Sequence, residues 1–504
     1  MFIIIALSEI LSAQITFQKR YGWIGDDEGY SVQQSFDGGY ISVGKSDNYT
    51  GYINIYLVKT NEYGDTLWTR TFNTGAGNTE GFSVEQTTDS GFIITGFTDF
   101  EIYLIRTDLN GDTLWTKVYI GFNDEVGYSI QQTFDGGFLI VGKTNTYGAG
   151  DDDVYLIKTN ANGDSLWTKT YGGLSSDEGR YARQTADSGF IIVGSTNSFG
   201  NGANDIYIIR TNMNGDTLWT RAIGDSLKNY AYSVQQTLDG GFIICGNTGN
   251  ISYSTYLLKI DSVGNISWSK TYSGSAYSVL QTADSGYVFA GSNGDALIVK
   301  TNLYGDTLWV RTFGELYGVR INFINLTSDR GFIMTGSKNV FDSMSYDVYL
   351  IKTDSNGYSS CSESNHSITV NAIPFQVVTP PTITSKGGQA FTFSTQTRIN
   401  DNRGSYVIPL CNTVDVHQPI SHSEFLVYPN PFHSKLTICS QKESVKDFFI
   451  VLQNMFGQSI FERKGKNLNS CFKETFDMSS LSPGMYLLNI SIDGKRTSSR
   501  VVKD

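Results

Sequence analysis

The first 365 residues of this 504-residue chain contain no histidine and no proline. The four histidines all lie at or after His366, and the eight prolines all lie at or after Pro374. Without imidazole, this part of the chain has no histidine-based catalytic triad and no histidine-ligated metal site. The abrupt change in composition predicts a domain boundary near Cys361.

Cysteine is also scarce, and the charge is uneven. Five cysteines are too few for a disulfide framework. Cys245 replaces Val in a repeated apolar strand, which predicts a core residue, whereas Cys361 and Cys411 can pair in an oxidising compartment. The net charge is −16 over residues 1–424 and +4 over residues 425–504. The acidic part is a poor partner for phosphate backbones, so we expect no nucleic-acid ligand.

Long apolar runs are missing as well. The longest N-terminal run, Phe2 to Leu11, is followed by Ser12-Ala13-Gln14, which predicts a partial signal peptide over residues 1–13. An ordinary N-terminal strand is the alternative. No other run approaches the length of a transmembrane helix.

Residues 15–361 contain seven copies of one pattern, each about 45–52 residues long, a period typical of four-stranded propeller blades. Each copy has an Asp-x-Gly turn, and six have a downstream Gly-Asp-Thr-Leu-Trp-like element. The turns are at Asp37, Asp89, Asp135, Asp187, Asp239, Asp284 and Asp329, and the tryptophans are Trp68, Trp115, Trp167, Trp219, Trp268 and Trp309.

The third copy shows four strands. Residues 128–133 alternate, residues 138–141 are continuously apolar, and residues 153–159 and 166–171 follow across turn signals. The seventh copy lacks a fourth strand, but Phe17 to Gly22 matches Trp167 to Gly172, with Phe17 in the tryptophan position. We therefore predict an all-β chain whose seven-bladed propeller closes by pairing residues 15–21 with residues 347–353.

Features shared by all the blades are poor candidates for a specific site. A catalytic residue has no reason to recur seven times, so the turn aspartates are predicted to hold backbone groups. The repeated Gln34, Gln86, Gln132, Gln184, Gln236 and Gln281, with Asn325, are predicted to satisfy backbone groups between blades. The position directly before these residues differs from blade to blade, so it is the better candidate for contacts with a ligand at the channel mouth. It holds Gln33, Glu85, Gln131, Arg183, Gln235, Leu280 and Ile324.

Length variation is concentrated in the loops between the second and third strands. These loops share a face with the inter-blade connections, and variable loops on a rigid scaffold commonly carry binding residues. They contain the aromatic residues Tyr49, Tyr52, Tyr147, Phe199, Tyr253, Phe341 and Tyr346. Asp151, Asp152 and Asp153 form the densest acidic cluster and are the candidate calcium ligands. Solvated loop acids and turn residues are the structural alternative.

Two functional classes stay open. The first is a non-enzymatic binding or adhesion module that recognises a glycan or a surface protein through this acidic, aromatic face. The second is a carboxylate-dependent glycosidase or lyase, which needs only paired Asp or Glu residues. We favour the first and expect no cofactor apart from calcium.

The chain after the repeats changes character. Residues 362–424 are rich in Ser, Thr and Asn and predict a linker, and the short strands of residues 425–504 predict a small Ig-like β-sandwich. This last segment resembles the C-terminal sorting domain of type IX secretion in Bacteroidota. The match lies at Tyr428, Pro429, Asn430, Pro431, Gly457, Pro483, Gly484, Tyr486 and Lys503.

The resemblance implies an outer-membrane translocon and a sorting protease as partners. It also implies a protein that is secreted or attached to the outer-membrane surface. The propeller is similar to repeat proteins that such exported chains carry, a likeness that implies the fold more than an activity.

Overall fold

A computed structural model describes the propeller, its outer strands and a C-terminal unit. The described residues are 14–22, 25–47, 52–74, 77–250, 253–314, 318–340, 345–359, 361, 363–365, 368–372, 374–380, 384–385, 390–392, 396–398, 406–414, 425–428, 435–440, 445–454, 459–468, 473–479, 481, 484–492 and 495–503. They contain strands and no helix, so no helix among them is long enough to cross a membrane. Residues Gln14–Asn412 form one compact unit, and Thr413–Asp504 belong to the other.

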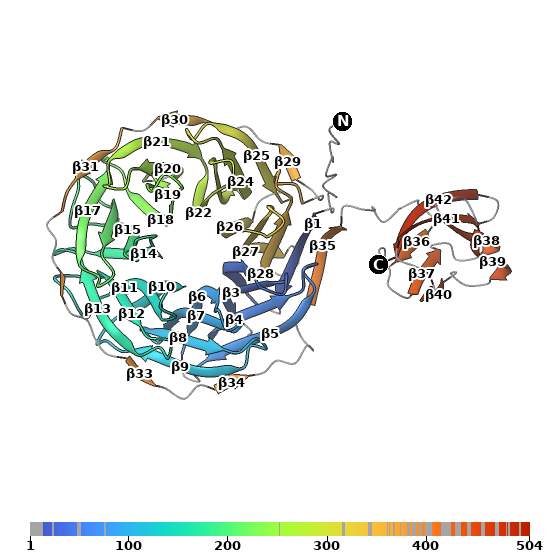
Figure 1. Cartoon of the computed structure of the whole chain (residues 1–504), viewed down its shortest axis with the longest axis horizontal. Helices are drawn as coiled ribbons and strands as arrows, with labels where there is room; N and C mark the ends of the chain where they lie inside the picture. The colour runs from blue at the N-terminus through green and yellow to red at the C-terminus, as the bar shows by residue number, and fades with distance from the viewer. Residues whose placement is uncertain are drawn as a thin grey trace, which may run out of the picture. The chain divides into compact units, whose positions relative to one another are not determined.

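Seven four-stranded antiparallel sheets form the blades of the propeller (Figure 1). Blades 1 to 3 are β2 (Asp27–Gln34), β3 (Tyr40–Asp47), β4 (Ile53–Thr60) and β5 (Thr66–Asn73); β6 (Thr79–Gln86), β7 (Phe92–Thr98), β8 (Glu101–Thr107) and β9 (Thr113–Tyr119); and β10 (Glu125–Gln132), β11 (Phe138–Thr144), β12 (Asp153–Thr159) and β13 (Ser165–Tyr171). The third blade thus confirms the four strands predicted from its sequence.

Blades 4 to 7 repeat the arrangement. They are β14 (Asp177–Gln184), β15 (Phe190–Thr196), β16 (Asp205–Thr211) and β17 (Thr217–Gly224); β18 (Asn229–Gln236), β19 (Phe242–Thr248), β20 (Ser254–Ile260) and β21 (Ile266–Ser273); β22 (Ser275–Gln281), β23 (Tyr287–Asn293), β24 (Asp295–Thr301) and β25 (Thr307–Phe313); and β26 (Val319–Leu326), β27 (Phe332–Val340), β28 (Ser345–Thr353) and β1 (Ile15–Gly22). The two middle strands are buried on both faces because each blade packs between two others.

In six blades the outer strand carries a tryptophan that docks onto the following blade. Trp115 packs against Phe138 with ring centroids 6.2 Å apart. It also lies against Gly163, where an added Cβ would come within 2.6 Å of the indole and where φ is +75°. Glycine meets both demands of this turn, and the apolar contact holds adjacent blades together without a cofactor.

The ring closes through β1, as predicted. β1 pairs antiparallel with β28, and Phe17 lies opposite Lys352. In blade 3 the equivalent partners are Trp167 and Lys158. Phe17 therefore takes the tryptophan position of the seventh blade, and strands from both ends of the repeat region complete one sheet.

The stretch predicted to be a linker adds a fifth strand to every blade. We call this series the belt: β29 (Glu363–Asn365), β30 (Val370–Ala372), β31 (Gln376–Val378), β32 (Thr384–Ser385), β33 (Ala390–Thr392), β34 (Gln396–Arg398) and β35 (Tyr406–Val414). In this order the strands pair with the outer strands of blades 6, 5, 4, 3, 2, 1 and 7 (Figure 1). The belt covers edges that would otherwise expose unpaired backbone groups.

The C-terminal unit contains two antiparallel sheets. One has β36 (Phe425–Tyr428), β37 (Lys435–Ser440) and β40 (Lys473–Asp477), and the other has β39 (Ser459–Leu468), β38 (Val445–Asn454), β41 (Gly484–Ile492) and β42 (Lys495–Lys503). Phe476 from the first sheet and Ile450 and Leu488 from the second share a core. This is a small β-sandwich.

Candidate functional site

A β-bulge recurs on the innermost strand of every blade. In blade 1 the register shifts between Gly29 and Ser31, which leaves Tyr30 unpaired. A bulge bends its strand and re-aims the extra side chain. The seven bulge residues are Tyr30, Phe82, Tyr128, Arg180, Tyr232, Tyr277 and Asn322.

The bulge residues line a cup in the central channel, of about 170 Å³. Phe82 lies between Tyr30 and Tyr128, with ring centroids 5.3 and 5.4 Å away. The Arg180 guanidinium lies 4.1 Å above the Tyr128 ring, and Tyr232 packs on Tyr277 at 5.2 Å. The innermost strand runs from the inter-blade connection to the Asp-x-Gly turn, and the bulge residues come before the positions that line the deeper part of the channel. The cup therefore lies on the side of the inter-blade connections and of the loops between the second and third strands.

Two aromatic rings form the floor of the cup. Tyr181 and Phe323, from blades 4 and 7, meet across the channel with centroids 6.3 Å apart. Five other blades carry serine at this position, for example Ser31 and Ser83. Below the floor is a second hollow of about 50 Å³, lined in part by Gln33, Glu85 and Arg183. Tyr181 and Phe323 thus divide the channel.

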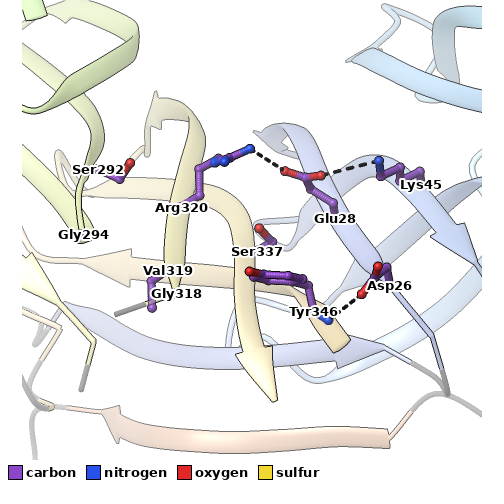
Figure 2. Close-up of a pocket in the computed structure, with 10 residues that line it drawn as sticks. All are labelled: Asp26, Glu28, Lys45, Ser292, Gly294, Gly318, Val319, Arg320, Ser337 and Tyr346. Atoms are coloured by element: carbon purple, nitrogen blue, oxygen red, sulfur yellow. Dashed lines mark hydrogen bonds and ion pairs between the residues drawn. The ribbon is translucent and has the colours of Figure 1, made fainter. Parts of the chain in front are cut away.

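A groove of about 450 Å³ also opens in the propeller, and it is lined by blades 6, 7 and 1 (Figure 2). Blade 6 has only a tight turn at Gly294 between its second and third strands, where blades 3 and 4, for example, have the loops 145–152 and 197–204. Figure 2 shows Glu28 between Lys45 and Arg320, at 3.7 and 3.9 Å. The Tyr346 backbone N–H donates to Asp26 at 3.0 Å.

Glu28 connects the groove to the cup. Its carboxylate accepts hydrogen bonds from the Tyr30 hydroxyl at 3.1 Å and from the Asn322 amide at 3.2 Å. The same hydroxyl lies 3.4 Å from Glu80, and Lys45 lies 3.9 Å from Glu80. Burial raises the pKa of Glu80 above its usual value, partly offset by Lys45 and the Tyr30 hydroxyl. The cup and the groove therefore share one hydrogen-bonded wall.

The aromatic loop residues that were predicted from sequence and that the structure describes lie in different blades. Tyr147 packs on Tyr155 and Phe199 packs on Tyr207, each within its own blade, with centroids 5.9 and 5.8 Å apart. Tyr52 and Tyr253 are exposed by 49% and 43%. Tyr49 and Phe341 lie outside the described residues.

The acidic cluster is divided among different partners. Asp152 forms an ion pair with Lys143 at 2.9 Å, Asp153 accepts a hydrogen bond from the Ala149 backbone N–H at 2.6 Å, and Asp151 is exposed. In the described part of the chain, no three His, Cys, Asp or Glu side chains are grouped so that they could hold a metal ion. Calcium binding here stays a prediction.

The repeated polar residues stabilise the fold, as predicted. The Gln132 side chain accepts from the Thr88 backbone N–H of the preceding blade at 2.9 Å and donates to Gly136 at 3.3 Å. Each turn aspartate also faces a buried cation that the sequence analysis missed, for example Lys158 beside Asp135 at 2.9 Å. The pKa of Asp89 is lowered by a hydrogen bond from the Thr87 hydroxyl and by the positive charge of Arg106, while partial burial opposes this shift.

The varying position next to these glutamines also links blades. The Gln33 side chain accepts from the Gln86 backbone N–H at 2.8 Å, and the Glu85 carboxylate accepts from that of Gln132 at 2.9 Å. In blade 7 the observed register puts Leu326 in the place of Gln34 and Asn325 in the place of Gln33. The sequence prediction that placed Asn325 with Gln34 and Ile324 with Gln33 was therefore wrong by one residue, because apolar Leu326 stands where the other blades have glutamine.

The sequence analysis missed the bulge residues. Their signal is nevertheless present: the residue seven positions before each turn aspartate is aromatic in five blades, Arg180 in the fourth and Asn322 in the seventh. Aromatic residues in a β-rich repeat are usually assigned to the core, and only the bulge turns these toward the channel.

Comparisons with known proteins bear mainly on the C-terminal unit. Residues 426–504 match the family described as the secretion system C-terminal sorting domain. Tyr486 is buried in the core of this unit, Gly484 begins β41 and Lys503 ends β42. Tyr428 ends β36, whereas Pro429, Asn430, Pro431, Gly457 and Pro483 lie outside the described residues. The match indicates export by type IX secretion, to the surface or the medium.

The chain also has distant structural neighbours. A protein of unknown function from Bacteroides caccae is 13% identical, with 53% of this chain and 90% of the other covered and a TM-score of 0.34. A suspected gluconolactonase is 9% identical, with 69% and 96% covered and a TM-score of 0.34. A tail fibre of Staphylococcus aureus phage P68 is 8% identical, with 98% and 97% covered and a TM-score of 0.26. No curated protein matches the chain.

Proposed function

We propose that this chain is an exported, non-enzymatic binding protein that holds its ligand in the cup and the adjoining groove. The observation that carries the proposal is the ring of bulge residues. The scaffold places seven side chains at equivalent positions, and Arg180 and Asn322 break the aromatic series. Chemical difference between blades on a rigid frame is what selective binding requires.

Binding can be tested with an array of glycans and cell-surface proteins probed with the full chain. We expect at least one binder, and we expect Tyr277→Ala to weaken that binding about tenfold or more, since it removes a ring from the cup. Phe134→Ala is the matched control because Phe134 is 72% exposed in an Asp-x-Gly turn, away from the cup. Equal binding by the wild type and Tyr277→Ala would contradict the site.

Export can be tested separately with residues 415–504 fused behind a signal peptide and a reporter in a host with type IX secretion. We expect the reporter on the cell surface or in the medium. A matched fusion ending at residue 494 lacks β42 and should stay in the periplasm. Retention of both fusions would contradict the assignment of the sorting function to this unit.

A carboxylate-dependent carbohydrate-active enzyme is the second candidate. The observation that favours it is the pair Glu28 and Glu80, which flank one tyrosine hydroxyl, with the pKa of Glu80 raised by burial. Two carboxylates in different environments are what acid-assisted glycoside cleavage uses. Reducing-sugar release from the bound glycan, abolished by Glu80→Gln, would establish this alternative over simple binding.

A further inference from the structure

We infer that the cup recognises the terminal residue of a neutral glycan chain and that the groove takes the residues that follow. This inference rests on the proposed binding function and names the ligand class for the same site. Four features of the site support it: the charged groups around the cup are paired, tyrosine hydroxyl groups in the cup are available to a ligand, aromatic rings close the floor of the cup, and the cup is connected to the groove.

The charged groups around the cup are paired with one another. Arg180 donates to Glu178 and stacks on Tyr128, so its charge is compensated within the protein. At the rim, Lys45 lies between Glu28 and Glu80, and Lys143 between Asp152 and Glu178, at 2.9 and 3.9 Å. A polyelectrolyte would have to break these pairs, whereas a neutral ligand would leave them intact.

The lining matches the two kinds of surface that a sugar ring presents. Aromatic faces suit the apolar C–H face of a sugar, and hydroxyl groups suit its edge. In the part of the protein that the structure describes, the hydroxyls of Tyr128, Tyr232 and Tyr277 donate no hydrogen bond to protein. Burial raises the pKa of Tyr128 and Tyr232, so these hydroxyls stay protonated and can donate to a ligand.

The size and floor of the cup favour a chain end. Its 170 Å³ is below the roughly 300–1,000 Å³ of pockets for drug-sized ligands, so it suits one ring-sized group. The contact between Tyr181 and Phe323 stops a chain from passing through the channel. Since Tyr30 and Asn322 in the cup both bond to Glu28 in the groove, a chain that ends in the cup can continue along the groove.

The test uses the full chain and calorimetric titration with defined oligosaccharides. The probes are manno-, xylo-, cello- and chito-oligosaccharides of two and six units, the matching polysaccharides, polygalacturonate and a mixed-charge peptide. We expect one neutral series to bind, with one site per chain end. Tyr277→Ala should weaken that binding about tenfold or more, Tyr277→Phe should weaken it less, and Phe134→Ala should leave it unchanged. Thermal melting of each variant identifies loss of folding.

Other outcomes distinguish the two proposals. Binding of polygalacturonate or the peptide in place of neutral sugars, still lost in Tyr277→Ala, would overturn the glycan inference and leave the binding function standing. Binding in proportion to polysaccharide mass, not to the number of chain ends, would overturn end recognition. If no probe binds and the array finds no binder that depends on Tyr277, both proposals fail.

Discussion

The ring of Phe17 packs edge-on against Tyr40, with centroids 5.7 Å apart, where the other six blade junctions have a tryptophan against Phe or Tyr. Phe17 is 1% exposed and lies about fifteen residues from the start of the chain. A residue near one end of the chain thus completes the contact that closes the ring.

Phe17→Ala is expected to lower the free energy of unfolding by about 3–5 kcal/mol, because it removes a fully buried ring at the closure. Phe17→Trp restores the residue of the other blades and should cost much less. Urea unfolding followed by circular dichroism measures both. Phe36→Ala is the control, since Phe36 is 67% exposed. Equal losses for Phe17→Ala and Phe36→Ala would show that the closure contributes little.

Loss of the belt should destabilise the propeller and make it associate. A chain ending at residue 362 exposes the edges of seven outer strands, which offer unpaired backbone groups to other molecules. We expect a lower melting temperature and concentration-dependent oligomers in light scattering, compared with a chain ending at residue 414. Both chains carry Cys361→Ser, and the longer chain also carries Cys411→Ser, so that a disulfide bond does not contribute to the difference. Identical melting and a monomer in both cases would rule out a stabilising role for the belt.

Cys361, which follows the last blade, is disulfide-bonded. We predict that its partner is Cys411, because β35 returns to blade 7, where it pairs with β1. The bond would close the belt around the propeller and restrict the unfolded chain, with an expected contribution of about 2–4 kcal/mol. Peptide mapping without reductant identifies the pair. Cys411→Ser should lower stability, and Cys245→Ala, at a buried free thiol, is the control. A different crosslinked peptide would refute the pairing.

The stability of the propeller should depend on pH because of Asp153, which lies at the junction of blades 3 and 4. Burial, and then the Asp177 carboxylate, raise the pKa of Asp153 to about 6 from its ordinary value of 3.8. The folded state therefore binds a proton that the unfolded chain releases. The stability gained in this way is complete below about pH 4 and is lost as the pH rises through 6.

Asp153→Asn should consequently raise the melting temperature at pH 8 and have little effect at pH 4. Melting from pH 4 to 8 measures this, with Asp151→Asn at an exposed position as the control. A difference between Asp153→Asn and the wild type that does not change with pH would contradict the assignment.

Glycine at four turns should stabilise the propeller. Ser90, Ser188, Ser285 and Arg330 have φ between 63° and 71°, at the position where blades 1, 3 and 5 have glycine. Side chains are strained in this region of backbone space, so Ser90→Gly should add about 0.5–1 kcal/mol, and the four changes should add up because they lie in different blades. Ser90→Ala keeps the strain and should give no gain in urea unfolding.

Much of the fold could be predicted from the sequence because it depends on local chemistry that recurs. Asp-x-Gly and Asn-x-x-Gly-Asp turns set strand ends, apolar runs mark strands buried on both faces, and the tryptophan marks the outer strand. Counting these signals identifies seven blades and shows that the seventh lacks a strand. The vacant place and the matching Phe17 then predict the closure, even though the two strands lie more than 300 residues apart.

The site and the belt depended on tertiary structure, for two physical reasons. Tyr30 and its equivalents point into the channel only because a bulge shifts the register of their strand against its neighbour, and register is a relationship between strands. Six of the seven belt strands, β29 to β34, are only two or three residues long, too short to show alternation. Their backbone groups are ordered by the outer edges they pair with, and those edges exist only after the seven blades have formed.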